Sequence, residues 1–338
     1  GGTLVIGVQD KTHNIIGVAD PFSIEEKITN LITHWIAPQI LPDIKILPYK
    51  QMQVLAIIVH PSPIRPHFLK NKGLENGTYI RIGSTNRKAD IALIHELQRF
   101  ALNKSYDEQL FTEMSIDAID FEAARTLFSS FRTLKRSDLQ TLKLAAKYQG
   151  KIVPTFGGVL LFGKKREQCF PDAWLQAGRF LGTDKSKILD TMEIHSYPVL
   201  AIEEAIQFVK KHATISFEIN AIQRTEHWSI PLPAIREAII NAVVHADYSQ
   251  LGAPIRLSIY SDRIEIENPG LLPFSLTVND ILKGVSKMRN RIIGRIFHAL
   301  NLIEQWGSGI QRMLSACKEA GLPEPKFEEL ANNFRVTI

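Results

Sequence analysis

Apolar and polar positions follow two different periods along the chain, and together they predict an α+β protein. Within the first hundred residues the apolar runs have the length and the flanking turns of strands. We place these strands at residues 3–8, 15–18, 45–48, 53–60 and 79–82. Between the second and the third, apolar residues spaced three and four apart predict a helix that Ser23 caps and Pro38 ends. These elements form one unit, which we assign to residues 1–100.

The middle of the chain, residues 101–213, has a mixed pattern and is assigned to a connecting α/β domain. Helical spacing dominates residues 111–150, whereas residues 174–181 have the pattern of a strand. Residues 198–212 carry apolar positions on one side, as a packed helix does.

A short apolar run at residues 159–162 is predicted to be a buried strand. The glycines that flank it, Gly158 and Gly163, are followed by Lys164 and Lys165, so the segment nearly spells a phosphate-binding P-loop. That motif needs a Ser or Thr in place of Lys165, because this hydroxyl ligates Mg²⁺. Its loop is also an open row of backbone N–H groups, whereas this interior is apolar. We therefore expect no P-loop here.

The last part of the chain, residues 214–338, is predicted to alternate helices with a β-hairpin. A helix containing Glu237 comes first, and alternating apolar residues then predict a hairpin with strands at 255–259 and 264–266. A polar and basic loop at residues 284–290 leads into a further helix.

Composition narrows the class of protein without naming a partner. With 338 residues, 45% hydrophobic and 22% charged, the chain can form two or three domains that each bury a core. The net charge is +5, and Lys and Arg are interleaved with acids, which permits a nucleic-acid partner without requiring one. Cys169 and Cys317 form no Cys-x-x-Cys pair, which favours a reducing cytoplasm.

No membrane segment or signal peptide is expected. The longest apolar runs are far too short to span a bilayer. The chain begins at Gly1 without Met, inside what looks like a turn beside a strand, so we expect natural sequence upstream of it.

Candidate chemistry gathers in the C-terminal part. Glu237 and Asn241 lie four apart on the predicted helix and so share one face. Carboxylate and carboxamide oxygens suit Mg²⁺, and a glutamate there could orient an attacking water. Two glycine turns follow, Asn268-Pro-Gly270 and Trp306-Gly-Ser-Gly-Ile310, which completes the layout of a nucleotide pocket. The alternative is a solvated helix face and two ordinary turns.

The order of these elements resembles the Bergerat (GHKL) ATP-binding fold, an α/β sandwich, and more closely the divergent GHKL-like domain found beside Schlafen-type AlbA_2 domains. The resemblance implies that Glu237 is the water-activating base and Asn241 the Mg²⁺ ligand. Asn268 stands where the superfamily has the aspartate that binds the adenine amino group, and Gly270 lies where backbone approaches the base. Leu272 replaces the second glycine of that motif. An amide accepts a hydrogen bond but carries no charge, so ATP hydrolysis, if it occurs, would be weak.

The same resemblance implies a phosphate side to the pocket. Its glycine turn would be Gly307, Ser308 and Gly309, and the donors of the lid loop would be Ser286, Lys287, Arg289 and Asn290. A domain contact or a homodimer contact is an equally good reading of this loop. His245 and Asp247 are expected to cap the helix end and bond locally, because the chain contains no nucleophile motif such as Gly-x-Ser-x-Gly.

The N-terminal hundred residues resemble the AlbA_2 domain of Schlafen proteins. The matching segments are Gly1–Val8, Pro63–Lys70 and Tyr79–Ser84. The resemblance implies nucleic-acid binding. The carboxylates with which Schlafen relatives cut RNA would lie upstream of the turn at Gly1 and Gly2, so we assign no nuclease site. The candidate contacts are basic residues beside Tyr79 and Phe68: Arg65, His67, Lys70, Lys72, Arg81, Arg87 and Lys88. A solvated loop whose cations serve solubility is the alternative.

Taken together, these features predict a nucleotide-responsive DNA- or RNA-binding regulator with ATP and Mg²⁺ as ligands. Relatives of this kind are labelled transcriptional regulators or helicase-related, but a helicase is not expected without a P-loop or paired motor domains. Two alternatives stay open: a non-catalytic binding module with a degenerate pocket, and a nucleic-acid-processing enzyme whose carboxylates lie outside this chain.

Overall fold

The computed structural model divides into two compact units, Gly1–Lys104 and Ser105–Ile338, which are described separately. It describes residues 2–60, 62–82, 85–213, 215–220, 223–228, 230–273, 276–304 and 307–338, without the side chains of 82, 215–220 and 223–228. Gly1, Gly83, Ser84 and Trp306 of the motifs quoted above lie outside the described residues.

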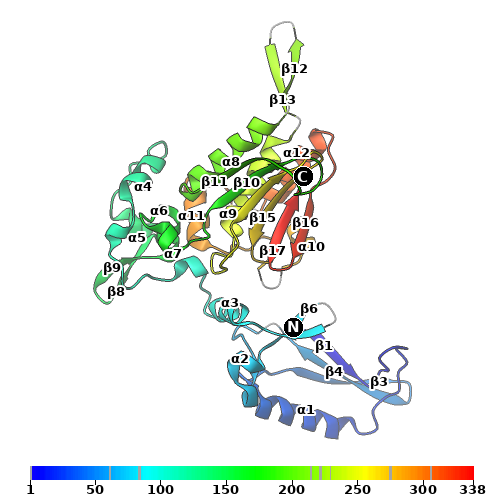
Figure 1. Cartoon of the computed structure of the whole chain (residues 1–338). Coiled ribbons are helices and arrows are strands. Elements are labelled where there is room, and N and C mark those ends of the chain that lie inside the picture. The colour runs from blue at the N-terminus through cyan, green and yellow to red at the C-terminus, as the bar shows by residue number, and fades with distance from the viewer. Residues whose placement is uncertain are drawn as a thin grey trace. The chain divides into compact units, whose positions relative to one another are not determined.

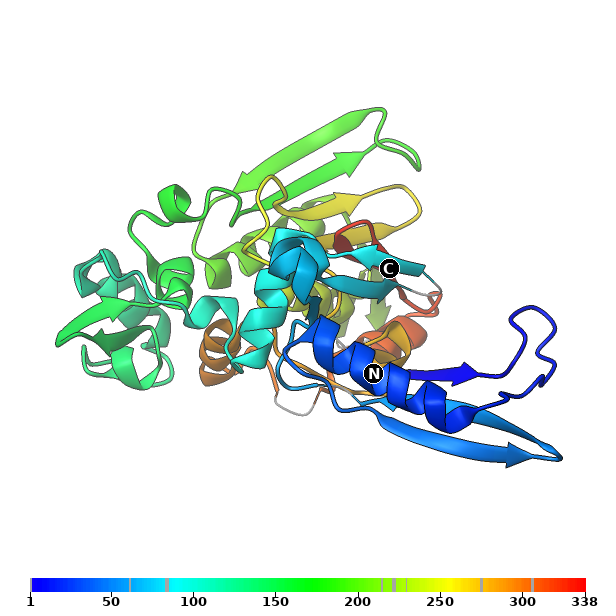
Figure 2. The same ribbon diagram turned by 90° about the horizontal axis from the view of Figure 1, so that it is seen from below.

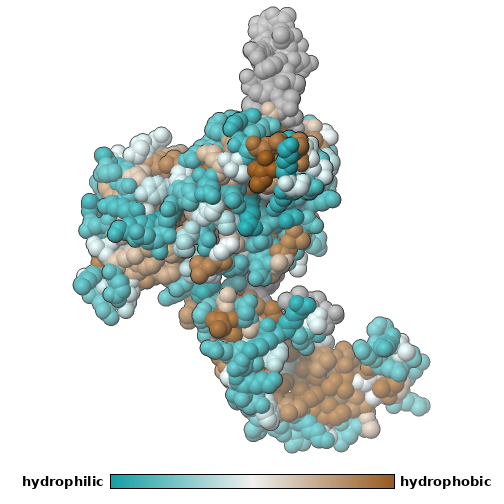
Figure 3. Space-filling view, viewed as in Figure 1, coloured by the Kyte–Doolittle hydropathy of each residue, from teal (hydrophilic) through white to brown (hydrophobic). Residues whose placement is uncertain are grey.

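A three-stranded antiparallel sheet is the centre of the first unit. Its strand order is β1 (Gly2–Ile6), β4 (Met52–Val59), β3 (Asp43–Tyr49). The helix α1 (Pro21–Trp35) lies beside β4, whose residues 54–57 are buried (Figure 2). Apolar side chains also gather on the surface over β1 and β4, where Leu4 is 62% exposed (Figure 3).

Smaller elements complete this unit. They are β2 (Ile36–Ala37) paired with β5 (Phe68–Leu69), the short helices at Lys70–Lys72 and α2 (Gly73–Gly77), the hairpin β6 (Tyr79–Ile82) and β7 (Thr85–Lys88), and α3 (Ile91–Ala101).

Two local predictions for this unit were wrong. The cap of α1 is Asp20, whose carboxylate accepts the Ser23 N–H at 3.0 Å, so Pro21 occupies the first turn, where its missing N–H is not needed. Residues 15–18 form no strand but a single bridge between Ile15 and Val8, because Gly17 turns the chain with φ +70°.

The second unit begins with a small helical and hairpin region. Its elements are the short helices Tyr106–Glu108 and Ile116–Ala118, α4 (Phe121–Phe128), α5 (Asp138–Thr141), the hairpin β8 (Ala145–Tyr148) and β9 (Lys151–Pro154), α6 (Phe156–Phe162) and α7 (Arg166–Cys169). The helical prediction for residues 111–150 therefore holds for α4 and α5 but misses β8.

The apolar run at 159–162 is helical, so the predicted strand was wrong. The α6 helix is buried on all sides, and a fully buried run has no polar face to reveal its period. Thr155 caps it by accepting the Gly158 N–H at 2.9 Å. Gly158 packs so closely on Leu144 that an added Cβ would lie 2.1 Å from the Leu144 carbonyl oxygen. This glycine therefore serves packing.

A six-stranded sheet is the core of the second unit (Figure 1). Its order is β11 (Ile188–Ile194), β10 (Leu175–Phe180), β14 (Ile255–Ile259), β15 (Ile264–Pro269), β17 (Asn333–Thr337), β16 (Lys326–Leu330). The pairs are antiparallel except β10 with β14. The helices α8 (Pro198–His212) and α9 (Leu232–His245) pack against β10 and β15 respectively. The middle segment thus supplies two strands of the C-terminal sheet.

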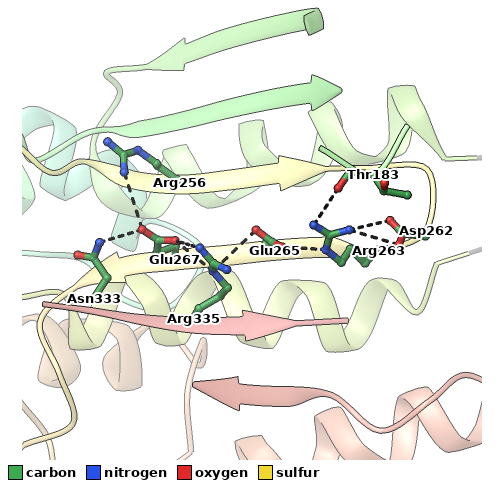
Figure 4. A network of polar contacts seen from close by, with 8 residues as sticks. All are labelled: Thr183, Arg256, Asp262, Arg263, Glu265, Glu267, Asn333 and Arg335. Atoms are coloured by element: carbon green, nitrogen blue, oxygen red, sulfur yellow. Dashed lines mark hydrogen bonds and ion pairs between the residues drawn. The ribbon is translucent and has the colours of Figure 1, made fainter. Parts of the chain in front are cut away.

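A ladder of alternating charges crosses three strands of this sheet (Figure 4). Arg256, Glu267 and Arg335 are directly opposite one another on β14, β15 and β17. The Arg335 guanidinium lies 2.8 Å from a Glu267 oxygen, and Arg263 donates to Glu265 at 2.8 Å. Opposite charges at facing positions stabilise strand pairing, so this ladder helps to fix the register.

The remaining elements connect or flank this sheet. A hairpin of β12 (Ile215–Asn220) and β13 (Gln223–Trp228) joins α8 to α9, and α10 (Val278–Leu282), α11 (Arg291–Ala299) and α12 (Gly309–Glu319) follow the β14–β15 hairpin. Of these, α12 packs along α9.

Candidate functional site

A cavity of about 1070 Å³, its open mouth included, lies between α9, the strands β15 to β17, the loop after β15 and the start of α12. Most of its lining is apolar and comes from these elements: Ala238, Ala242, Ile266, Leu271, Leu276, Val285, Ile310, Met313, Phe327 and Phe334. Polar groups are few: Glu237, Asn241, His245, Asn268, Ser286, Lys287, Glu304 and Arg312. An apolar cavity of this size with a few converging polar groups is typical of a small-molecule site.

Glu237 and Asn241 share one face of α9 at this cavity. The Asn241 amide nitrogen lies 3.4 Å from Glu237 Oε1, one turn away. The Glu237 side chain is only 12% exposed, so the alternative of a solvated helix face does not apply to it. It contacts Gly309 so closely that an added Cβ would lie 2.0 Å from Glu237 Oε1. A larger residue at the start of α12 would require the Glu237 carboxylate to move.

Asn268 and the turn that follows it also border the cavity, beside the end of α9. Asn268 is buried in β15, where its Nδ2 donates to the Pro269 carbonyl at 3.0 Å and leaves Oδ1 as the acceptor. Gly270 has φ +95°, and an added Cβ would lie 2.7 Å from Asp247 Cβ. The Asp247 N–H donates to Pro269 O at 2.8 Å, which ties this turn to the end of α9.

The lid-loop residues divide into two groups. Ser286 and Lys287 line the cavity, and Gly307 packs beneath the loop, since its added Cβ would lie 2.7 Å from the Gly284 carbonyl oxygen. The Arg289 guanidinium instead contacts the Leu271 carbonyl oxygen and lies 3.5 Å from Asp247 Oδ2. Neither Arg289 nor Ser308 is part of the cavity lining.

Asn290 is not a donor to the cavity, contrary to the prediction. It is fully buried, and its Nδ2 donates to the carbonyls of Val244 at 2.9 Å and Ala246 at 2.8 Å. These are carbonyl groups at the end of α9, where helix geometry leaves no intrahelical partner. Asn290 therefore fastens the end of the lid loop to the end of α9.

Asp247 bonds locally, as predicted. Asp247 Oδ1 accepts the backbone N–H of Ser249 at 3.1 Å and its hydroxyl at 2.6 Å. Burial and the positive charge of Arg289 lower the pKa of His245 to about 4, so its imidazole is neutral at pH 7.

Arg312 and Glu304 were missed by the sequence reasoning. Arg312 Nη2 lies 3.0 Å from Glu237 Oε2, and Nη1 lies 2.7 Å from Glu304 Oε1. The other Glu304 oxygen accepts the Ser308 hydroxyl at 2.8 Å. The available signal was spacing, since Arg312 is three residues after Gly309 and so belongs to the first turn of a helix beginning at that glycine.

The basic residues of the first unit do not form one cluster of equivalent groups. Arg65 is half-buried, with its Nε donating to Ser62 O at 2.8 Å and its guanidinium 4.9 Å from the Phe100 ring centroid. His67 is half-buried, and its Nδ1 lies 2.7 Å from Pro38 O. Lys70 is exposed but donates to Thr33 O at 2.8 Å. These three residues therefore hold loops of the unit.

One face of the β6–β7 hairpin combines the other cations with an aromatic ring. Tyr79 is opposite Lys88, and Arg81 is opposite Asn86, so all four side chains share a face. Lys72 joins them, with its Nζ 3.0 Å from the Tyr79 hydroxyl. We call Lys72, Tyr79, Arg81 and Lys88 the hairpin face; all four are exposed. Arg87 is opposite Ile80 and belongs to the other side.

The described ranges offer neither a metal-binding cluster nor a membrane-spanning helix. They contain no group of three or more His, Cys, Asp or Glu side chains that could hold a metal ion. Nor does any helix among them have the length and apolar character needed to cross a membrane.

Comparison with protein families supports both predicted ends of the chain. Residues 1–90 match the family described as Schlafen, AlbA_2. Residues 252–338 match HATPase_c_4, whose description is a provisional assignment to the "ATP-dependent DNA helicase recG C-terminal". The chain thus carries an AlbA_2 domain at its start and an HATPase-like domain at its end, in an α+β fold. These matches associate the two ends of the chain with a nucleic-acid-related and an ATPase-type domain family.

One solved structure is similar over the whole chain. It is the DIP2311 protein from Corynebacterium diphtheriae, with a TM-score of 0.58 and 23% sequence identity. The alignment covers 100% of this chain but 66% of that one, so the present chain spans just under two thirds of its relative. At this identity the likeness concerns the fold. No curated protein matches the chain.

Proposed function

We propose that this protein binds ATP in the C-terminal cavity and nucleic acid on the hairpin face, and that the nucleotide regulates the nucleic-acid affinity. The observation that carries the proposal is the cavity itself. It brings an amide acceptor, Asn268, and the Glu237–Asn241 pair into one lining that is otherwise mostly apolar. Adenine is flat and largely apolar with an amino group at its edge, so it matches this set of groups.

In this proposal, the adenine amino group donates to Asn268 Oδ1 and the base lies against Leu271 and Phe334. The phosphates extend toward Ser286 and Lys287 of the lid loop. Asn241 offers a hard oxygen donor that suits Mg²⁺ and would hold the ion against the phosphates, with Glu237 beside it as the base. The ion would supply neutralisation of phosphate charge.

ATP hydrolysis is proposed to be slow, because the base is already paired. Glu237 Oε2 is 3.0 Å from Arg312, so in the nucleotide-free protein a guanidinium occupies this oxygen and has to leave before the oxygen can take a proton from water. The same contact favours a second candidate function, a nucleotide-binding module that does not hydrolyse its ligand.

The hairpin face is the proposed nucleic-acid contact. Lys72, Arg81 and Lys88 supply cations for phosphates, and the Tyr79 ring supplies a surface on which a base can stack. Phosphate contacts and base stacking carry little sequence information, so binding is expected to be weakly sequence-specific.

Isothermal titration calorimetry with ATP tests the nucleotide proposal. In the presence of Mg²⁺ the wild-type protein should bind ATP, and chelating the metal should weaken the affinity. Asn241→Ala should bind ATP equally with and without Mg²⁺, because the variant lacks the proposed ligand. The matched control is Asn279→Ala, an exposed asparagine of α10 outside the cavity lining. A metal effect that survives in Asn241→Ala, or no heat from the wild type, contradicts the proposal.

A further inference from the structure

Arg312 holds together the charged groups at the mouth of the cavity. Its guanidinium bridges Glu237, at 3.0 Å, and Glu304, at 2.7 Å. The Arg312 side chain is 42% exposed, whereas that of Glu237 is 12% exposed. The bridge therefore joins an accessible cation to a mostly buried carboxylate.

The cavity lining is electrically balanced in this state. Among the described residues that line it, the cations are Lys287 and Arg312 and the carboxylates are Glu237 and Glu304. A nucleoside triphosphate brings several negative charges to this mouth. Repulsion from the two carboxylates would oppose nucleotide binding unless a cationic side chain turned from a carboxylate to the phosphates.

Arg312 has the chemistry and the position to make that change of partner. A guanidinium is a planar fork that binds phosphate oxygens through two parallel hydrogen bonds. Its present bond to Glu304 is to an exposed carboxylate, and such surface pairs are weak. Gln311 donates to Leu282 O at 2.7 Å, which keeps this turn of α12 beside the end of α10.

We propose that Arg312 is a specificity residue that leaves Glu237 and binds the terminal phosphates of a nucleoside triphosphate. This inference rests on the proposed nucleotide function. It names the side chain that discriminates among nucleotides by their number of phosphates. Arg312 distinguishes ATP from AMP, and its departure frees the Glu237 oxygen that it occupies in the nucleotide-free protein.

The test is a set of dissociation constants for ATP, ADP and AMP, measured by calorimetry. Arg312→Ala should weaken ATP about 10- to 100-fold, as expected for loss of a charged hydrogen-bond donor, with a smaller loss for ADP and little for AMP. Arg312→Lys keeps the positive charge but lacks the planar guanidinium, so its ATP affinity should lie between those of the wild type and Arg312→Ala. Arg295→Ala, an exposed arginine of α11 outside the cavity lining, is the matched control. Circular dichroism verifies that each variant is folded.

Repeating the set in a Glu237→Gln background separates two roles for Arg312. If Arg312 binds phosphate, its removal still weakens ATP when Glu237 carries no charge. Equal losses for ATP and AMP, or a loss that disappears with Glu237→Gln, would show that Arg312 only neutralises the carboxylate and would overturn the inference alone. A wild-type protein that binds none of the three nucleotides would overturn the proposed function as well.

Discussion

Asp107 is a buried carboxylate whose partners all come from one helix end or its own turn. Its oxygens accept the backbone N–H groups of Arg291 at 3.1 Å, Ile292 at 2.7 Å and Ile293 at 3.0 Å. It thereby caps α11 from a position about 185 residues earlier in the sequence. Desolvation outweighs these hydrogen bonds and raises its pKa from 3.8 to about 6.

This shift predicts a specific pH dependence of stability. Because the folded pKa is higher than the unfolded one, the contribution of Asp107 is present below about pH 4 and is lost as the pH rises through 6. The loss is on the order of 3 kcal/mol. His245 acts in the opposite sense, since its folded pKa of about 4 is below its usual value, and stability is lost as the pH falls toward 4.

Urea unfolding of the wild type and of Asp107→Asn between pH 3.5 and 7 isolates the Asp107 contribution. The difference in unfolding free energy between the two proteins should change across pH 4 to 6, whereas the His245 contribution cancels. Parallel pH profiles would contradict the assignment.

Glu237 is the residue on which ATP turnover should depend. Loss of a general base typically costs about 10² to 10⁴-fold in rate, so Glu237→Gln should release phosphate far more slowly than the wild type. Its ATP affinity should not fall, because the variant removes a negative charge from the phosphate end. Glu319→Gln, at the exposed end of α12, is the control. Equal turnover in wild type and Glu237→Gln would reassign the base.

At the scale of elements, the sequence predicted what local periodicity determines. The hairpin of β14 and β15, the helix α9 and the shared face of Glu237 and Asn241 all follow from spacing. The strand predicted at 159–162 failed because α6 is buried on every side. Spacing puts Arg312 in the first turn of α12, but neither its partner Glu237 nor the helix end that Asn290 binds could be predicted, because each partner is distant in the sequence.

The β6–β7 register makes a prediction that the sequence alone could not make. Arg81 belongs to the hairpin face and Arg87 to the opposite side, and both arginines are exposed. Arg81→Ala should therefore weaken nucleic-acid binding severalfold, whereas Arg87→Ala should have little effect. Fluorescence anisotropy with a labelled oligonucleotide measures both. Equal losses would indicate a diffuse basic surface instead of a face.

For the molecule as a whole, the net charge of +5 implies few phosphate contacts. The hairpin face carries three cations, so the logarithm of the affinity for single strands should fall with the logarithm of salt with a slope of about −2. Affinities measured from low to moderate salt give this slope, and unrelated sequences should give the same value. Binding that does not depend on salt would exclude a phosphate-based contact.

The start of the second unit is bonded to the helix that follows the lid loop. Asp107 follows the end of the first unit by three residues and caps α11, the helix that follows the lid loop. A nucleotide that moves the lid loop would therefore act on the helix end to which the start of the second unit is bonded. The sequence separation of these groups explains why no local pattern could predict this connection.

The most direct test of the account is the affinity of the intact chain for a labelled oligonucleotide, measured with and without saturating ATP and Mg²⁺. Coupling between two sites commonly changes affinity about 5- to 150-fold, and it is reciprocal, so the oligonucleotide should change ATP affinity by the same factor. We predict such a change in the wild type and a much smaller one in Asn241→Ala with Mg²⁺ present. An oligonucleotide affinity that is identical with and without ATP, in a sample whose ATP binding is verified by calorimetry, would contradict nucleotide-regulated nucleic-acid binding.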